Sequence, residues 1–95
     1  NSLVFGMDPQ MAVEAPRFAT ASVENSFYPH NYYPGKLELE DGIAESTADA
    51  LRARGHEIGR AANCGLGATV SVRDPKTGNL STGADHRRAC YAMGL

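Results

Sequence analysis

The hydrophobic pattern of this chain is dominated by short segments typical of β-strands. Leu37 and Leu39 alternate with charged residues over 36–40, which predicts a half-buried strand with both leucines pointing inward. Small and β-branched residues over 18–23 predict another strand. Further strands are predicted over 57–61, 68–73, 80–84 and 88–93.

Two helices interrupt this pattern. Asp8 and Pro9 form a typical helix start, because the Asp side chain can accept from free N–H groups of the first turn and Pro suits the first helical position. Pro16 ends that helix, since it lacks the N–H that a continuing helix needs. A second helix is predicted over 43–54, followed by Gly55 as a left-handed cap and held on the sheet mainly by Leu51.

The order of these elements is helix, two strands, helix and then strands only. Because strands and helices do not alternate strictly, the order predicts an α+β fold, with a mixed or antiparallel sheet and two helices. The segment 74–79 has the Pro and Gly of a hairpin turn. The segment 24–36 is a loop with an aromatic content well above that of the rest of the chain.

Length and charge limit the classes of function. The 95 residues suffice for one domain at most. The 11 acidic and 9 basic residues are scattered and sum to a net charge of −2, so nucleic acids and anionic membranes are poor candidate partners. No apolar run approaches the roughly 20 residues of a membrane-spanning helix. The composition therefore predicts a small globular domain with no nucleic-acid and no membrane partner.

The His and Cys residues do not have the spacing of a metal site. His30, His56 and His86 lie far apart along the chain, so neither a metal nor another cofactor is predicted. Cys64 and Cys90 have no C-x-x-C spacing, and two small buried side chains are favoured over a redox site. Whether these two cysteines pair is left open.

The glycines of segment 64–69 (CGLGAT) suggest a phosphate-binding loop at first sight. That interpretation needs a Lys and a following helix, and the segment leads into a predicted strand instead. Glycines that permit a close backbone approach before a strand are therefore favoured.

A set of ordered motifs spans nearly the whole chain. Residues 8–18 (DPQMAVEAPRF) lie near the start, and 83–88 (GADHRR) with 92–95 (AMGL) lie at the end. Between them stand Gly42-Ile43, 54–58 (RGHEI) and 74–80 (DPKTGNL). Together these motifs resemble the C-terminal segment of the small subunit of gamma-glutamyltransferases, also called gamma-glutamyltranspeptidases.

The resemblance implies a fold and an activity. Residues 1–95 would be a single segment, the C-terminal portion of a catalytic domain with the four-layer αββα sandwich of the N-terminal-nucleophile (Ntn) hydrolases. The complete enzyme would hydrolyse or transfer gamma-glutamyl groups from glutathione-like amides, a reaction of glutathione metabolism. The implied partners are the small gamma-glutamyl substrate and the remainder of the same gene product, namely the large subunit and the N-terminal part of the small subunit.

The family's nucleophile is an N-terminal threonine that self-cleavage exposes, with its amine as base. The threonines of this chain are all internal: Thr20, Thr47, Thr69, Thr77 and Thr82. The nucleophile and the oxyanion-binding groups are therefore expected upstream of Asn1, and no residue of this fragment is expected to be catalytic. Its expected contribution is to complete the core and support the site from behind.

Arg17, Asp85 and Arg87 are the positions that the resemblance singles out. The corresponding family arginines stand in Ala-Pro-Arg-Phe and Asp-Pro-Arg motifs, and the resemblance implies that they brace the sheet and the chain end through ion pairs. Asp85 is a candidate partner for them. The chain departs from the family pattern at His86, where the family has Pro, and over 89–91.

A second class of function stays open. Tyr and Phe bury a large area at low entropic cost, so loop 24–36 could serve a non-enzymatic interaction module. The resemblance to typical family members implies a periplasmic or extracellular location, whereas the residues alone leave a cytoplasmic location open.

Overall fold

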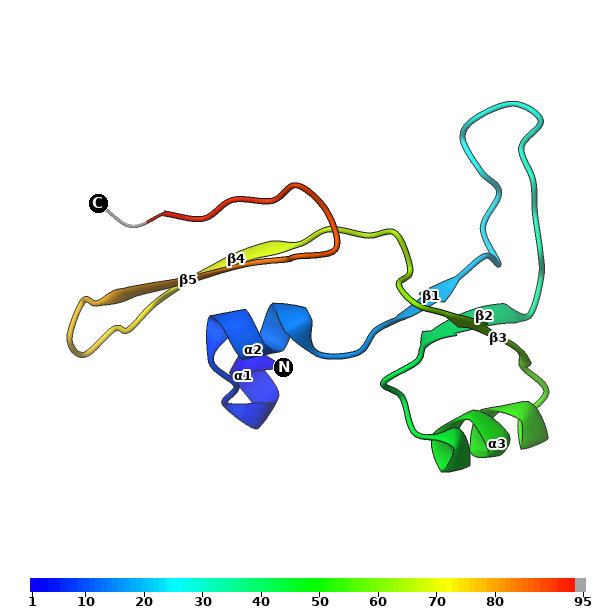
Figure 1. Ribbon diagram of the computed structural model, residues 1–95, viewed down its shortest axis with the longest axis horizontal. Helices are drawn as coiled ribbons and strands as arrows, with labels where there is room; N and C mark the ends of the chain where they lie inside the picture. Colours follow the sequence, from blue (N-terminus) through cyan, green and yellow to red (C-terminus); the bar gives the residue numbers. More distant parts are fainter. Residues whose placement is uncertain (94–95) are drawn as a thin grey trace. The chain divides into compact units, whose positions relative to one another are not determined.

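The computed structural model describes residues 1–93, which form two compact units (Figure 1). Unit 1 comprises Asn1–Ala15 and the described residues from Gly65 onward, and unit 2 comprises Pro16–Cys64. Unit 1 contains α1 (Ser2–Phe5), α2 (Pro9–Glu14), β4 (Thr69–Arg73) and β5 (Leu80–Ala84). Unit 2 contains β1 (Phe18–Thr20), β2 (Lys36–Glu40), α3 (Glu45–Ala53) and β3 (Glu57–Ala61).

Unit 2 is a mixed three-stranded sheet with one helix on its face (Figure 1). Strand β1 runs antiparallel to β2 with Phe18 opposite Leu39, and β2 runs parallel to β3 with Leu37 opposite Ile58. Parallel neighbours need a crossover connection, and α3 provides it. The core of the unit lies between α3 and the sheet, where Leu39 is 1% and Ala48 is 0% exposed.

Unit 1 is a β-hairpin against which a short helix packs. Strands β4 and β5 are antiparallel, and the loop between them turns at Gly78, where φ is +77°. Helix α2 begins as the sequence predicts, with the Asp8 carboxylate accepting from the backbone N of Gln10. Its residue Val13 is buried. The helix depends on the hairpin, because a helix of six residues is too short to be stable alone.

The predicted strands 36–40, 57–61 and 80–84 have the observed bounds, and the α+β class is confirmed. Other expectations about the elements are wrong. The described residues form two sheets rather than one, and α1 adds a helix that was not predicted. Strand β1 ends at Thr20, whose hydroxyl accepts from the backbone N of Ser22 and starts a turn. No strand forms over 88–93, because the Asp85 carboxylate accepts from the backbone N of Arg87 and turns the chain there.

Helix α3 contacts the sheet differently from the prediction. Ala48 is its buried residue, whereas Leu51 is only half-buried and lines an open cavity. The described helix begins at Glu45 rather than Ile43, since the backbone N of Ile43 bonds to the carbonyl of Glu40 in a turn. Among residues 1–93, no helix has the length and apolar character needed to cross a membrane.

Candidate functional site

A buried carboxylate, that of Asp85, organises the end of unit 1. The residue is 1% exposed. Its Oδ2 accepts from the backbone N of Ala68 at 3.2 Å, and its Oδ1 accepts from the backbone N of Arg87 at 3.0 Å. The backbone N of Asp85 in turn donates to the carbonyl of Ala68 at 3.0 Å. The segment that follows β5 is thereby fixed to the segment that precedes β4.

The Arg87 guanidinium lies between Asp85 and the end of α2. Its side chain is 8% exposed, and Nη1 lies 3.2 Å from Asp85 Oδ1. Nη1 also donates to the carbonyl of Val13 at 2.9 Å, and Nη2 donates to those of Glu14 at 3.1 Å and Ala15 at 3.3 Å. The last carbonyls of a helix have no partner within it, and a cation there also complements the helix dipole. Arg87 thus caps α2 with charge and with hydrogen bonds.

A side-chain amide makes a second connection between α2 and the hairpin. The Gln10 Nε2 donates to the carbonyl of Ala84 at 3.0 Å, and the backbone N of Ala84 donates to Gln10 Oε1 at 3.0 Å. This pair has the form of a backbone–backbone bridge, so Gln10 occupies the position that a further strand would take beside Ala84. The same Nε2 lies 2.7 Å from Glu14 Oε1.

A second buried carboxylate, that of Glu40, holds the two ends of unit 2. Glu40 is 3% exposed. Its Oε2 accepts from the backbone N of Arg17 at 2.9 Å, and its Oε1 accepts from the backbone N of Cys64 at 3.0 Å. The backbone N of Glu40 donates to the carbonyl of Arg17 at 2.9 Å. One side chain therefore joins the first and the last turn of the unit.

Arg60 and Arg52 form an exposed ionic network around the start of α3. Arg60 Nη1 donates to the carbonyls of Ile43 at 2.7 Å and Glu40 at 3.2 Å, and its Nη2 pairs with Glu45. Arg52 Nη1 lies 2.7 Å from Glu45 Oε1. The hydrogen bond from Arg52, followed by that from Arg60, lowers the pKa of Glu45 below its usual value. These groups are in solvent, so the network positions the loop before α3 more than it stabilises the fold.

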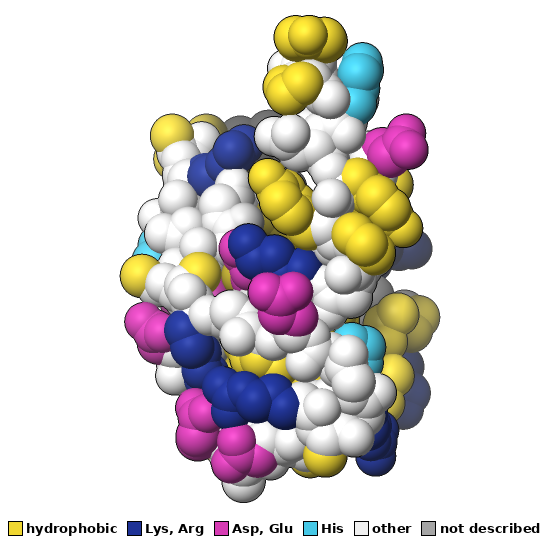
Figure 2. Space-filling model, turned by 90° about the vertical axis from the view of Figure 1, so that its right-hand side faces the viewer, with side chains coloured by type: hydrophobic (Ala, Val, Ile, Leu, Met, Phe, Trp, Pro, Cys, Tyr) yellow, Lys and Arg dark blue, Asp and Glu magenta, His cyan; other side chains and the backbone are white. Residues whose placement is uncertain are grey.

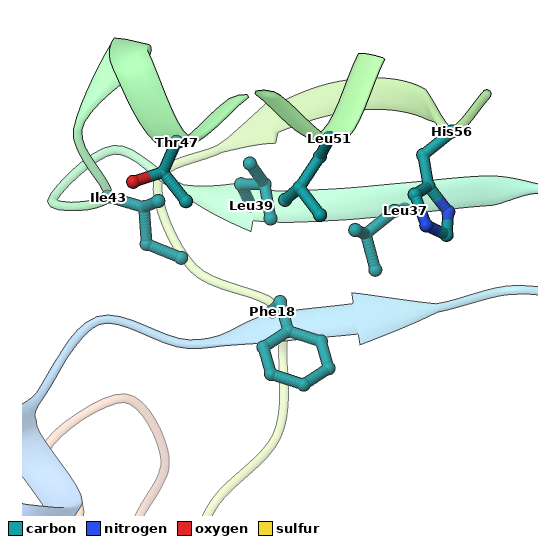
Figure 3. A pocket seen from close by; sticks show the side chains of 7 residues that line it. All are labelled: Phe18, Leu37, Leu39, Ile43, Thr47, Leu51 and His56. Atoms are coloured by element: carbon teal, nitrogen blue, oxygen red, sulfur yellow. The ribbon is translucent and has the colours of Figure 1, made fainter. Parts of the chain in front are cut away.

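A hydrophobic cavity of about 420 Å³ opens between α3 and the sheet of unit 2 (Figure 3). Figure 3 shows Thr47 and Leu51 pointing from α3 toward the strands, with Leu37 and Leu39 on β2 and Phe18 on β1. The lining residues are Phe18, Leu37, Leu39, Ile43, Thr47, Leu51 and His56. The cavity is therefore a hollow in the core of the unit rather than a polar cleft.

The aromatic loop between β1 and β2 projects from unit 2, and Figure 2 shows hydrophobic side chains gathered on it. Phe27 is 79% and Tyr28 is 90% exposed. Backbone bonds from Asn25 to Asn31 and from His30 to Phe27 close the loop on itself. The loop is thus an ordered turn that presents aromatic side chains to solvent.

Comparison with known protein families shows which family the chain belongs to. The family described as gamma-glutamyltranspeptidase matches residues 1–95. The chain belongs to this family. A comparison with curated protein sequences found no match.

Solved structures resemble the gamma-glutamyltranspeptidase chain over nearly its full length. A structure named LmbA2991T421A has 34% sequence identity and a TM-score of 0.81, and the match covers 98% of this chain and 16% of that one. LmbA2991HD has 36% identity and a TM-score of 0.77, with the same two shares. The cephalosporin acylase from Bacillus halodurans has 28% identity and a TM-score of 0.73, over 96% of this chain and 15% of that one. The chain thus spans about a sixth of the length of these solved chains.

Within this gamma-glutamyltranspeptidase segment, the structure brings two of the three predicted site residues together. Asp85 and Arg87 are in contact in unit 1. Arg17 lies in unit 2, where its backbone pairs with Glu40. The roles of Glu40 and Gln10 were not predicted. Their partners lie 23, 24 and 74 positions away, so no local pattern in the sequence could have revealed them.

The two cysteines and Gly67 are packed against neighbouring parts of the chain. Cys64 and Cys90 are half-buried rather than buried as expected, and Cys64 Sγ donates to the carbonyl of Glu38 at 3.8 Å. A Cβ on Gly67 would lie 2.9 Å from Cys90 Sγ and 3.0 Å from Arg88 Cβ, so the glycine permits a close approach of these side chains just before strand β4. Among residues 1–93, no three His, Cys, Asp or Glu side chains are grouped so that they could hold a metal ion.

Proposed function

We propose that residues 1–95 are the C-terminal portion of the catalytic domain of a gamma-glutamyltransferase-like enzyme with the αββα sandwich of Ntn hydrolases. The complete enzyme hydrolyses or transfers gamma-glutamyl groups from glutathione-like amides. One observation carries the proposal: the family match extends over all of this chain, which spans only 16% of the solved chain that it resembles at a TM-score of 0.81. The remainder of the gene product supplies the rest of the domain.

The reaction takes place on groups outside this segment. The hydroxyl of an N-terminal threonine adds to the amide carbonyl while the threonine amine takes the hydroxyl proton. The C–N bond then breaks, the amine product leaves with a proton, and the gamma-glutamyl group stays as an ester on the threonine. Water or the amine of an amino acid attacks that ester and restores the free hydroxyl.

Residues 1–95 have a structural role in the proposed enzyme. Arg87 donates to three carbonyls and pairs with Asp85, so both terminal nitrogens of its guanidinium already have protein partners. An arginine held in this way does not need a substrate carboxylate to satisfy it. Its arrangement supports a structural role for Asp85 and Arg87, in keeping with the proposal that the catalytic groups lie elsewhere.

The test compares the complete gene product with the 95-residue chain, using a chromogenic gamma-glutamyl amide and glutathione as substrates. We expect turnover by the complete protein and none by the rigorously purified chain. A cephalosporin amide is the third substrate, because a cephalosporin acylase is among the similar structures. If the complete protein turned over only the cephalosporin amide, the substrate class would be cephalosporin amides instead of gamma-glutamyl amides. Turnover by the isolated chain would contradict the assignment of the nucleophile to a segment outside residues 1–95.

A second candidate function rests on the aromatic loop. The exposure of Phe27 and Tyr28, at 79% and 90%, favours a binding surface. The mass of the natural gene product separates the two candidates. A product near 10.1 kDa favours the interaction module, whereas a much larger precursor that splits into two subunits favours the enzyme.

A further inference from the structure

The cavity of unit 2 has a closed floor and an open rim. Leu39 at its base is 1% exposed, whereas Phe18 at its edge is 65% exposed. Figure 3 shows the Phe18 ring on the side of the cavity opposite Thr47 and Leu51. The side chains of α3 and the Phe18 ring therefore lie on opposite sides of a hollow that the described residues of unit 2 do not fill.

The chemistry of the lining selects the kind of occupant. Among the described residues, no Lys, Arg, Asp or Glu lines the cavity, and of the lining side chains only those of Thr47 and His56 carry polar groups. A gamma-glutamyl substrate carries a carboxylate and an ammonium group, and both need charged or hydrogen-bonding partners when they leave water. The cavity therefore does not suit that substrate. It suits uncharged hydrophobic side chains.

The size of the cavity agrees with a protein segment. A cavity of roughly 150 Å³ can hold one benzene ring. The volume of about 420 Å³ in unit 2 is therefore sufficient for two or three large hydrophobic side chains. Burying such a hydrophobic surface is favourable because it removes apolar area from water, so a covered cavity is preferred over a hydrated one.

A covering segment is available in the longer chains that share this fold. The match with LmbA2991T421A includes 98% of this chain and only 16% of that chain. The same fold thus forms there as a small part of a much longer polypeptide, which must pack against some of its faces. The hydrophobic hollow of unit 2 is the face best suited to that packing.

We infer that the cavity bounded by Phe18, Leu37, Leu39 and Leu51 is the docking surface for an uncharged, hydrophobic segment of the remainder of the same polypeptide. Phe18 at the rim contributes its exposed ring to the contact with that segment. The inference rests on the proposed function, because it requires the complete gene product of which this chain is a part.

Photo-cross-linking in the complete gene product tests the inference. The photoreactive residue p-benzoylphenylalanine replaces Phe18 in one variant and Leu51 in a second, so that a folding defect of one does not decide the result. Ala50, which is exposed on α3 and does not line the cavity, carries the same residue in the control. After irradiation, mass spectrometry identifies the cross-linked peptides.

We expect both cavity variants to cross-link to one hydrophobic peptide outside residues 1–95, with a yield at least tenfold above that of the Ala50 control. Cross-links confined to residues 1–95 would mean that the chain covers its own cavity, and cross-links between two copies would make it a homo-oligomer interface. Either result overturns the inference, as does an absence of cross-links in both variants.

Activity separates this inference from the proposed function. A protein that turns over gamma-glutamyl amides but gives no such cross-link leaves the function standing and removes the docking surface. A cross-linked protein that is inactive on every amide leaves the docking surface and removes the function. A natural gene product no longer than this chain would overturn both.

Discussion

Arg87 supplies the hydrogen-bond donors that the short helix α2 lacks at its end. With six residues, α2 leaves most of its carbonyls without a helical N–H partner. The guanidinium donates to the carbonyls of Val13, Glu14 and Ala15 while Asp85 balances its charge. Neither charge is isolated in the interior, because each is paired and hydrogen-bonded. The stability of this corner depends on both partners being present.

Replacing Arg87 with Ala should cost about 3–5 kcal/mol of folding free energy, since the Asp85 carboxylate would remain buried without its cation. In the complete enzyme this should lower the yield of soluble, mature protein and leave the KM of the matured fraction nearly unchanged. Arg88→Ala is the control, because Arg88 is an exposed neighbour. A normal yield with a large rise in KM would assign Arg87 to the substrate instead.

Replacing Glu40 with Gln tests the carboxylate that joins the ends of unit 2. The amide keeps one acceptor oxygen but presents an NH₂ group to a backbone N–H, either of Arg17 or of Cys64. A buried donor without an acceptor costs about 1–3 kcal/mol. Urea unfolding of the complete protein should show this loss, whereas Glu38→Gln, at a half-buried site with a single Lys36 partner, should change stability by less than about 1 kcal/mol. Equal effects of the two changes would rule out the special role of Glu40.

At the scale of elements, helix α2 approaches strand β5 at the one place where the strand has no side chain. A Cβ on Gly83 would lie 2.5 Å from the carbonyl oxygen of Pro9 and 2.8 Å from the backbone N of Gln10. Backbone atoms cannot rotate away as side chains can. The glycine therefore sets the distance at which the Gln10 amide reaches Ala84 and the Arg87 guanidinium reaches the end of the helix.

Gly83→Ala should separate α2 from β5 and destabilise the protein by about 1–3 kcal/mol or more, as overpacking of a close contact does. Gly59→Ala is the matched control, because Gly59 also lies in a strand and its Cβ would meet only Glu38 Cγ at 3.6 Å and Lys36 Cε at 3.9 Å. Thermal unfolding of the two variants gives the comparison. If the two variants lost the same stability, the cause would be the change in strand propensity and not the close approach of α2 to β5.

The sequence predicted elements well where the signal is local. Asp8 capping α2, the alternation of Leu37 and Leu39, and the turn at Gly78 each depend on neighbours a few residues away. The prediction failed where burial or the end of an element depends on residues that are distant in the sequence. The burial of Glu40 depends on Arg17 and Cys64, and the absence of a strand over the described residues 88–93 depends on how Asp85 bonds to Ala68 and Arg87. Asp85 was predicted as a partner of Arg87 from the family resemblance, because the spacing of residues alone cannot show which arginine is buried.

At the scale of the whole molecule, the small number of buried residues stands out. Among the described residues, the buried hydrophobic side chains are those of Val13, Leu39 and Ala48, while large hydrophobic side chains on both units are exposed. So small a core provides little of the hydrophobic free energy that a domain of this length needs. The chain is therefore expected to gain much of its stability from the remainder of the enzyme.

Leu51→Ala should show this dependence. Leu51 is half-buried in the cavity lining, so in a protein whose cavity is covered its truncation should cost about 2–4 kcal/mol, as for a core leucine. Leu80→Ala removes the same atoms from a leucine that is 69% exposed and should cost less than about 1 kcal/mol. Urea unfolding of the complete protein measures both. A cost under about 0.5 kcal/mol for Leu51→Ala would mean that the cavity stays open to water.

The discontinuity of unit 1 has a consequence for the order in which the nascent chain can fold. Gln10 and Ala84 are 74 positions apart, and all the strand pairings of unit 2 lie between them. At roughly 5–20 residues per second, the ribosome makes α2 about 4–15 s before the strand that receives it. During that interval the Ala84 backbone and the Arg87 guanidinium that bond to α2 have not been made, while unit 2 can already close through Glu40. Helix α2 is thus made before unit 2 and reaches its native contacts after unit 2 has closed, so a chaperone or protease that acts during translation meets α2 without its hairpin.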